Sequence, residues 1–188
     1  MVKHRRLNPD RVIAQAVGMA DEAGSVTAVS LTALAQALDI RPPSLYNHVA
    51  SLEDLQHGMA LYSLRQLVAD LRQASQGLVG REALFAIANA YRRFATDHPG
   101  IYPLTIRAPE PDDAALAALA QELVQLLLLV MTTIGLHGAD ALHAIRGLRA
   151  ILHGFTSLEA AQGYKMPLDQ EESFRRLVNT YLDGLVAK

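Results

Sequence analysis

The sequence contains no cysteine, which excludes several kinds of site at once. Without thiols there is no disulfide, no thiolate zinc or iron–sulfur site and no cysteine nucleophile. A hydrophobic run of the ~20 residues that cross a bilayer is also missing. The most apolar run, residues 123–131, is short and is expected to form a buried core helix. The basic N-terminal segment has no apolar stretch behind it and does not resemble a secretory signal, so we expect a soluble, cytoplasmic protein without a membrane partner.

Recognisable catalytic motifs are absent as well. The chain has no glycine-rich phosphate loop, no zinc-protease helix motif and no nucleophile elbow. Among its seven histidines, His137, His143 and His153 are six and ten residues apart, which places them on different faces of a helix. We therefore expect no enzyme, no metal and no cofactor, because an enzyme would have to build its site from scattered residues.

Charge is nearly balanced but unevenly distributed. The net charge is −2, with +1 in residues 1–50 and −3 in the remainder. Four of the first eleven residues are basic, namely Lys3, Arg5, Arg6 and Arg11. Such a segment can serve as an arm that contacts nucleic-acid phosphates, or it can be an ordinary solvated tail, and charge alone does not decide between them.

Helix signals recur from end to end, and no strand-like alternation of apolar and polar residues is present. Asn8 followed by Pro9 is a helix start signal, and Gly24 suits a left-handed C-terminal cap. The pattern predicts an all-α protein of about nine helices, with a three-helix N-terminal part and a larger C-terminal bundle. The expected helices include residues 9–23, 31–38, 42–49, 52–76, 81–98, 112–134, 139–162 and 169–186.

The most informative stretch is residues 30–55, which read SLTALAQALDIRPPSLYNHVASLEDL. A capped helix, a short turn and a second short helix that begins at two prolines define a helix-turn-helix. Leu45 and Val49, four residues apart, are expected to face the core. The outward positions then carry groups that reach base edges and phosphates, namely Arg41, Pro42, Ser44, Tyr46, Asn47 and His48. Spacing alone also allows a helical hairpin that merely completes a bundle.

Residues 8–56 resemble the DNA-binding domain of the tetracycline-repressor (TetR) family of one-component regulators. The likeness rests on VIAQAVGMADEAGSVTAVSLTALAQALDIRPPSLYNHVASLEDL, which follows that domain nearly position by position. Two later segments, AYRRFATDHPGIYPL and RAILHGFTSLEAAQGY, are similar to the C-terminal effector domain of one branch of the family. The resemblance implies residues 1–52 as a helix-turn-helix DNA-binding domain and residues 53–188 as an effector-binding and dimerisation domain.

The resemblance also implies roles for individual side chains. Tyr46 and His48 occupy positions that contact DNA phosphates in the family, and Thr32 begins the helix that crosses the backbone. The positions that read or approach bases are Arg41, Pro42, Ser44 and Asn47.

Two residues depart from the family pattern. Asp39 replaces the usual turn glycine, although Asp is among the few other residues that tolerate a positive φ. Leu52 stands where lysine is common, so one contact with the DNA backbone is expected to be missing.

Candidate effector residues are polar side chains that interrupt apolar helix faces. Each of them either pairs internally or awaits a ligand, because an unpartnered buried polar group costs free energy. The candidates are Asn89, Arg92, Tyr102, Thr132 and His143. By resemblance, the last two helices form the dimer interface, with Leu148, Leu152, Phe155, Phe174, Leu177 and Tyr181 as candidate contacts.

These observations predict a homodimeric transcriptional regulator, more specifically a repressor that binds a palindromic double-stranded DNA operator. A small-molecule effector of unknown identity is expected to release it. The alternative from another class is a helical protein-interaction module without DNA binding, which predicts no salt-dependent affinity for DNA.

Overall fold

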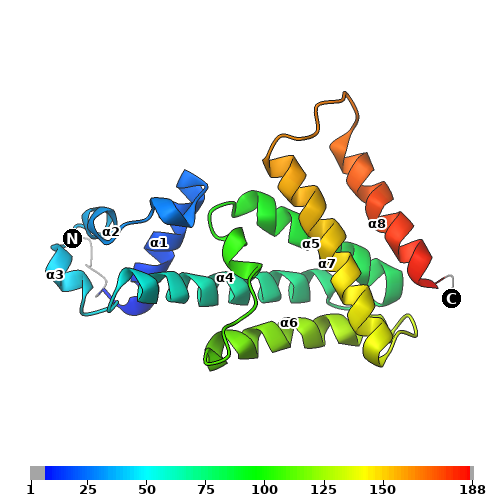
Figure 1. Ribbon diagram of the computed structural model, residues 1–188, viewed down its shortest axis with the longest axis horizontal. Helices are drawn as coiled ribbons and strands as arrows, with labels where there is room; N and C mark the ends of the chain where they lie inside the picture. The colour runs from blue at the N-terminus through cyan, green and yellow to red at the C-terminus, as the bar shows by residue number, and fades with distance from the viewer. Residues whose placement is uncertain (1–6, 187–188) are drawn as a thin grey trace. The chain divides into compact units, whose positions relative to one another are not determined.

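The computed structural model describes residues 7–186, and these form an all-α protein (Figure 1). Eight α-helices and two short 3₁₀-helices account for the regular structure of this part of the chain, which confirms the predicted fold class with one helix fewer than expected. The helices are α1 (Pro9–Ala23), α2 (Leu31–Ala37), α3 (Pro42–Leu45), α4 (Leu52–Ser75), α5 (Gly80–Asp97), α6 (Ala114–Thr132), α7 (Gly138–Ala160) and α8 (Gln170–Val186), with η1 (Val26–Ala28) and η2 (Tyr102–Thr105) between them. Lys3, Arg5 and Arg6 of the predicted basic arm lie outside the described residues.

The chain packs into two compact units. The first, called the N-terminal unit below, combines the chain up to residue 65 with residues 97–116, and the C-terminal unit combines residues 66–96 with the chain from residue 117 onward. Helix α4 is continuous from one unit into the other. The functional division predicted at residue 52 concerns which residues bind DNA, and it stays a prediction.

The helix boundaries of the N-terminal unit follow the capping signals in the sequence. The side chain of Asn8 accepts a hydrogen bond of 2.9 Å from the amide of Arg11, and Pro9 occupies the first turn. Gly24 closes α1 in the left-handed conformation, with φ of 65°. Apolar residues of α1 and of the helices packed on it form the buried core of this unit, including Val12, Ala16, Leu34, Leu45, Leu55 and Met59.

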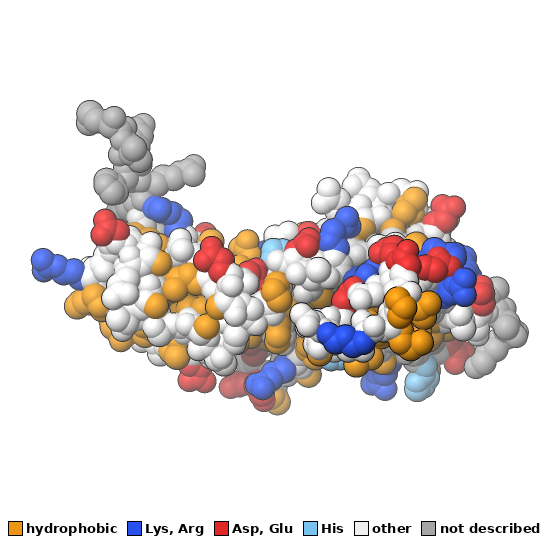
Figure 2. Space-filling view, turned by 90° about the horizontal axis from the view of Figure 1, so that it is seen from above, with side chains coloured by type: hydrophobic (Ala, Val, Ile, Leu, Met, Phe, Trp, Pro, Cys, Tyr) orange, Lys and Arg blue, Asp and Glu red, His pale blue; other side chains and the backbone are white. Residues whose placement is uncertain are grey.

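Helices α5, α7 and α8 supply most of the core of the C-terminal unit. Their large apolar side chains are almost fully buried, among them Leu84, Ile87, Phe94, Leu148, Leu152, Phe174 and Val178. Helices α7 and α8 lie side by side and run in opposite directions (Figure 1). On the face shown in Figure 2, acidic and basic side chains lie next to one another over this unit, and on α8 Glu172 pairs with Arg175 and Arg176.

Helix α6 differs from the expectation of a buried core helix. The structure buries Val130 and Met131 of this helix, and its leucines are half-buried except Leu129, which is exposed. Exposed residues spaced three and four apart give α6 a solvent-facing stripe, made of Ala118, Gln121, Gln125 and Leu129. Among the described residues, α6 is the one helix that could cross a membrane by length and composition. One such helix is weak evidence, because a helix of a soluble protein passes the same test.

Candidate nucleic-acid interface

Helices α2 and α3 and the turn between them form the predicted helix-turn-helix. The hydroxyl of Ser30 caps α2 by accepting a hydrogen bond of 3.2 Å from the amide of Ala33. Asp39 adopts the positive φ that the sequence suggested, at 54°, and the amide of Ile40 donates to the carbonyl of Ala35 across the turn at 3.0 Å. The turn therefore has the geometry of the motif although it contains no glycine.

Helix α3 is shorter than predicted. It begins at Pro42. Proline has no amide hydrogen, and it fits the first turn because amide hydrogens there have no helical partner. The helix ends at Leu45 rather than near Val49. Beyond Leu45 the chain continues as a tight turn, in which the amides of His48 and Val49 both donate to the carbonyl of Leu45, at 2.9 and 3.1 Å. The residues predicted on one short helix are thus presented by one helical turn and the turn that follows it.

The side chains of this segment separate cleanly into buried and exposed sets. Leu45 is 1% exposed and Val49 4%, so both face the core as predicted. The outward set, called the α3 face below, consists of Arg41, Pro42, Ser44, Tyr46 and Asn47, all of which are exposed. His48 lies at its edge and is half-buried, and Thr32 is exposed on α2.

The surroundings of the α3 face leave its polar groups available. Within the described residues, no ion pair involves a side chain of this face. At the start of α4, Leu52 is 40% exposed, at the position where the resemblance leads one to expect lysine. The first turn of α4 is capped by Ser51, whose hydroxyl accepts from the amide of Asp54 at 3.0 Å. In return, the carboxylate of Asp54 accepts from the amide of Ala50 at 2.8 Å.

The predicted effector residues are divided between the two units. Tyr102 belongs to the N-terminal unit and is buried there, whereas the other four belong to the C-terminal unit. Thr132 is exposed and donates to the carbonyl of Leu129 at 2.7 Å, and Asn89 is half-buried. The role of all five in ligand binding stays a prediction.

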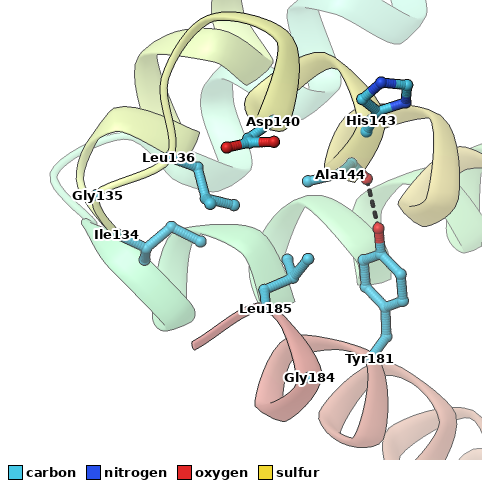
Figure 3. A pocket seen from close by; sticks show the side chains of 9 residues that line it. All are labelled: Ile134, Gly135, Leu136, Asp140, His143, Ala144, Tyr181, Gly184 and Leu185. Atoms are coloured by element: carbon cyan, nitrogen blue, oxygen red, sulfur yellow. Dashed lines mark hydrogen bonds between the residues drawn. The ribbon is translucent and has the colours of Figure 1, made fainter. Parts of the chain in front are cut away.

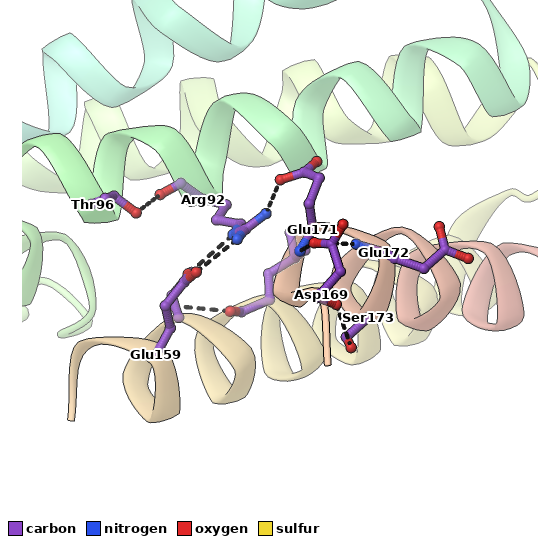
Figure 4. Close-up of polar contacts among 9 residues, drawn as sticks. Arg92, Thr96, Glu159, Asp169, Glu171, Glu172 and Ser173 are labelled. Carbon is purple, nitrogen blue, oxygen red and sulfur yellow. Dashed lines mark hydrogen bonds and ion pairs between the residues drawn. The ribbon is translucent and has the colours of Figure 1, made fainter. Parts of the chain in front are cut away.

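Arg92 is fully occupied by partners inside the C-terminal unit (Figure 4). Its guanidinium donates to both carboxylate oxygens of Glu159, at 2.6 and 3.0 Å, and to Glu171 at 2.6 Å. It also lies over two aromatic rings, 5.3 Å from the centre of Phe155 and 4.8 Å from that of Phe174. The hydrogen bonds to Glu159 raise the pKa of Arg92 above its ordinary value. This arrangement is that of an internal ion-pair cluster.

His143 lines a cavity of about 470 Å³ in the C-terminal unit (Figure 3). Its walls come from the loop that follows α6, from α7 and from α8. Its lining residues are Ile134, Gly135, Leu136, Asp140, His143, Ala144, Tyr181, Gly184 and Leu185. Apart from His143, these residues were not predicted as effector residues, because many of them are apolar or glycine and typical of any core.

A single hydrogen bond shapes one wall of this cavity. The hydroxyl of Tyr181 donates to the carbonyl of Ala144 at 2.6 Å, and burial raises the pKa of Tyr181. The bonded ring lies where a Cβ on Gly147 would come within 2.3 Å of the hydroxyl oxygen, so the glycine leaves room for the tyrosine. Among the described residues, no group of three or more His, Cys, Asp or Glu side chains is placed to hold a metal ion.

The six residues predicted at the dimer interface fall into two groups. Leu148, Leu152, Phe155 and Phe174 are at most 6% exposed, and they pack inside the C-terminal unit. Leu177 and Tyr181 are half-buried. The first four contribute to the core of a single chain, whereas Leu142 on α7 is exposed. The role of the six residues at a dimer interface stays a prediction.

Comparison with known proteins gives consistent matches over most of the chain. Residues 84–181 match the family model described as tetracyclin repressor-like, C-terminal domain. The HTH-type transcriptional regulator YobS of Bacillus subtilis (strain 168) is 32% identical over 181 residues, which covers 96% of this chain and 93% of YobS. The crystal structure of Mycobacterium smegmatis BioQ is 25% identical, with a TM-score of 0.69, and the match covers 97% of this chain and 99% of that one. A structure of BioQ with its double-stranded DNA operator is similar in fold, with 24% identity, a TM-score of 0.69, and coverage of 97% and 100%.

Proposed function

The chain belongs to the tetracycline-repressor-like (TetR) family of transcriptional regulators, and on that premise we propose that it is a cytoplasmic, homodimeric repressor that a small molecule releases from a palindromic DNA operator. The observation that carries the proposal is the α3 face. A one-turn helix gains little stability from its own propensity, and two buried side chains, Leu45 and Val49, hold it in place. What it presents outward is a set of hydrogen-bonding groups.

Each group of the α3 face has a role in this proposal. Arg41 and Asn47 carry the planar guanidinium and amide that form paired hydrogen bonds with guanine and adenine edges, and Pro42 and Ser44 approach the bases beside them. Tyr46, His48 and Thr32 contact phosphate oxygens, which position the motif without reading sequence. The expected loss of one phosphate contact at Leu52 lowers affinity for all sequences alike.

The dimer is proposed to form through the exposed sides of α7 and α8. Two observations support these surfaces. Leu142 is 44% exposed, and Gly154 and Gly184 are exposed with open space where a Cβ would lie. Glycine inside a helix costs about 0.5–1 kcal/mol relative to alanine, a cost that a close approach by a second helix can offset. Two-fold symmetry then places the two α3 faces on half-sites roughly 34 Å apart, or a multiple of that distance.

The cavity of the C-terminal unit is the proposed effector site. Its volume of about 470 Å³ falls in the range of ligand pockets, and its lining combines apolar side chains such as Leu136 and Leu185 with polar groups. The carboxylate of Asp140 is the charged group on its wall, which favours a small, largely apolar molecule with a hydrogen-bond donor or a positive charge. Such a ligand releases the repressor by binding more tightly to a conformation that does not fit the operator.

Selection of bound duplexes from a random DNA pool tests the proposal, with the purified full-length chain. The expected result is a palindromic consensus whose affinity falls steeply with salt, because Arg and Lys contacts displace counterions from the phosphates. A chain that enriches no sequence, and whose weak binding to DNA does not depend on salt, would be a protein-interaction module instead.

A further inference from the structure

A carboxylate at the end of α1 is bonded to a segment far away in the sequence. One oxygen of Asp21 lies 2.7 Å from Nδ1 of His98, and the other accepts from the amides of Gly100 and Ile101, at 3.0 and 3.2 Å. The side chain of Asp21 is 17% exposed, so this contact is largely shielded from water. A single carboxylate thus holds three donors of the turn that follows α5.

The backbones of α1 and of the turn after α5 also lie close together at this point. A Cβ on Gly100 would lie 2.0 Å from the carbonyl oxygen of Ala20 and 2.2 Å from its carbonyl carbon. Gly100 is buried, and no positive φ demands glycine there, so the need is for space alone. Ile101 beside it is 0% exposed. The turn is therefore packed directly against the last turn of α1.

The other end of the same segment is also fastened. Residues 97–116 are called the connecting segment. Near its end, Asp113 caps α6 by accepting from the amide of Leu116 at 3.0 Å. The second oxygen of Asp113 lies 3.0 Å from Nε2 of His57 on α4. All of these contacts lie within the N-terminal unit.

The connecting segment matters because of what precedes and follows it in the chain. Helix α5 enters it and helix α6 leaves it, and both helices otherwise belong to the C-terminal unit. The chain therefore passes between the units three times, along α4, at the end of α5 and at the start of α6. Asp21 and Asp113 bond the two ends of the segment through which α5 and α6 join the N-terminal unit.

We infer that Asp21 is a positioning residue for operator recognition: by fastening α1 to the connecting segment, it fixes the orientation of the helix-turn-helix and hence the half-site spacing that the dimer accepts. The inference rests on the proposed function. Asp21 touches no DNA in this scheme, and its effect is on which spacings bind rather than on which bases are read.

The test compares operators that differ only in spacing. From the selected consensus, duplexes are made with one base pair added or removed between the half-sites, and their affinities are measured by titration. The wild-type chain is expected to lose roughly tenfold in affinity on each altered spacing. For Asp21→Ala, the ratio between the original and altered spacings should fall to about threefold or less, while the preferred bases of each half-site stay the same.

The test compares the ratio of the affinities for the original and altered spacings. This ratio is insensitive to misfolding, because an inactive fraction lowers both affinities alike. Asp21→Asn keeps an oxygen acceptor for the two amides and is expected to show a smaller shift in the same direction. Glu22→Ala removes the exposed neighbouring carboxylate on the same helix and should keep the wild-type ratio. An unchanged ratio in both Asp21 variants overturns the inference, whereas failure of the wild-type chain to select any duplex overturns the proposed function.

Discussion

Two arginines, one in each unit, show opposite uses of the same side chain. Arg41 on the α3 face is exposed, and its side chain neither caps a helix nor forms an ion pair within the described residues. Arg92 in the C-terminal unit is 15% exposed, paired with Glu159 and Glu171 and covered by two aromatic rings. The comparison teaches that a polar group is a candidate for recognition when buried neighbours turn it outward, and a structural group when the chain supplies its partners.

The largest expected effect is on stability, and it comes from removing Arg92, the arginine that has its partners within the chain. Arg92→Ala leaves Glu159 without its main partner in a partly buried site and removes the cation from Phe155 and Phe174. We expect a loss of about 3 kcal/mol in the free energy of unfolding, measured by urea titration. The exposed neighbour Arg93 provides the control, since Arg93→Ala should change stability by less than about 0.5 kcal/mol. Equal losses in the two variants would contradict the structural role of Arg92.

The next prediction compares two glycines, one in each unit, at which an added Cβ would meet neighbouring atoms. Gly100→Ala in the N-terminal unit pushes a Cβ into backbone atoms of Ala20, which cannot move aside, so we expect a loss of about 2–3 kcal/mol. Gly147→Ala in the C-terminal unit meets only the end of the Tyr181 side chain, and the better helix propensity of alanine offsets part of the cost. Its stability in the same titration should lie within about 1 kcal/mol of wild type, and the reverse order would refute the packing argument.

The α3 face is tested by DNA affinity rather than by stability. Arg41→Ala and Asn47→Ala are expected to relax the preference at particular base pairs by about 1–3 kcal/mol, because each removes a paired contact with a base edge. Tyr46→Phe and His48→Ala should instead weaken binding to all sequences alike, since phosphates carry no sequence information. Titration against single-base variants of the operator separates the two outcomes. Uniform losses in all four variants would show the assigned roles to be wrong.

The smallest effect concerns an ion-pair group on the surface of α8. Hydrogen bonds from Arg175 and Arg176 lower the pKa of Glu172 from its ordinary value of 4.5 to about 2. A carboxyl whose pKa is lower in the folded state stabilises the fold above its ordinary pKa and loses that contribution as the pH falls toward 2. The difference in stability between wild type and Glu172→Gln should therefore shrink between about pH 5 and pH 2 in acid unfolding. It should be small throughout, because exposed ion pairs contribute little.

The sequence predicted the N-terminal unit better than the C-terminal one, for a physical reason. Helix caps such as Asn8 and Gly24 act within a few residues, and so does the positive φ of Asp39, so their signals can be read locally. The α3 face followed from the four-residue spacing of Leu45 and Val49. The early end of α3 was missed, because the change to a tight turn after Leu45 depends on packing rather than on a breaker residue.

What the sequence did not show in the C-terminal unit depends on contacts between distant residues. Arg92 had the pattern of a ligand-binding group, and only the fold brings Glu159 and Glu171 to it across 67 and 79 residues. In the same way, periodicity identified the apolar faces of α7 and α8 but did not distinguish a side chain buried in its own chain, such as Phe174, from one available to a partner. The three bonds made by Asp21 left no local signal at all.

The proline pair that opens α3 has a consequence for how the protein meets DNA. Pro42 and Pro43 fix their φ angles before folding is complete, so the unfolded chain has fewer conformations to lose at this point. A recognition surface that is already ordered pays little additional entropy when it docks. Association should then resemble the meeting of two rigid bodies, and single-base discrimination should persist at temperatures where flexible reading segments lose it.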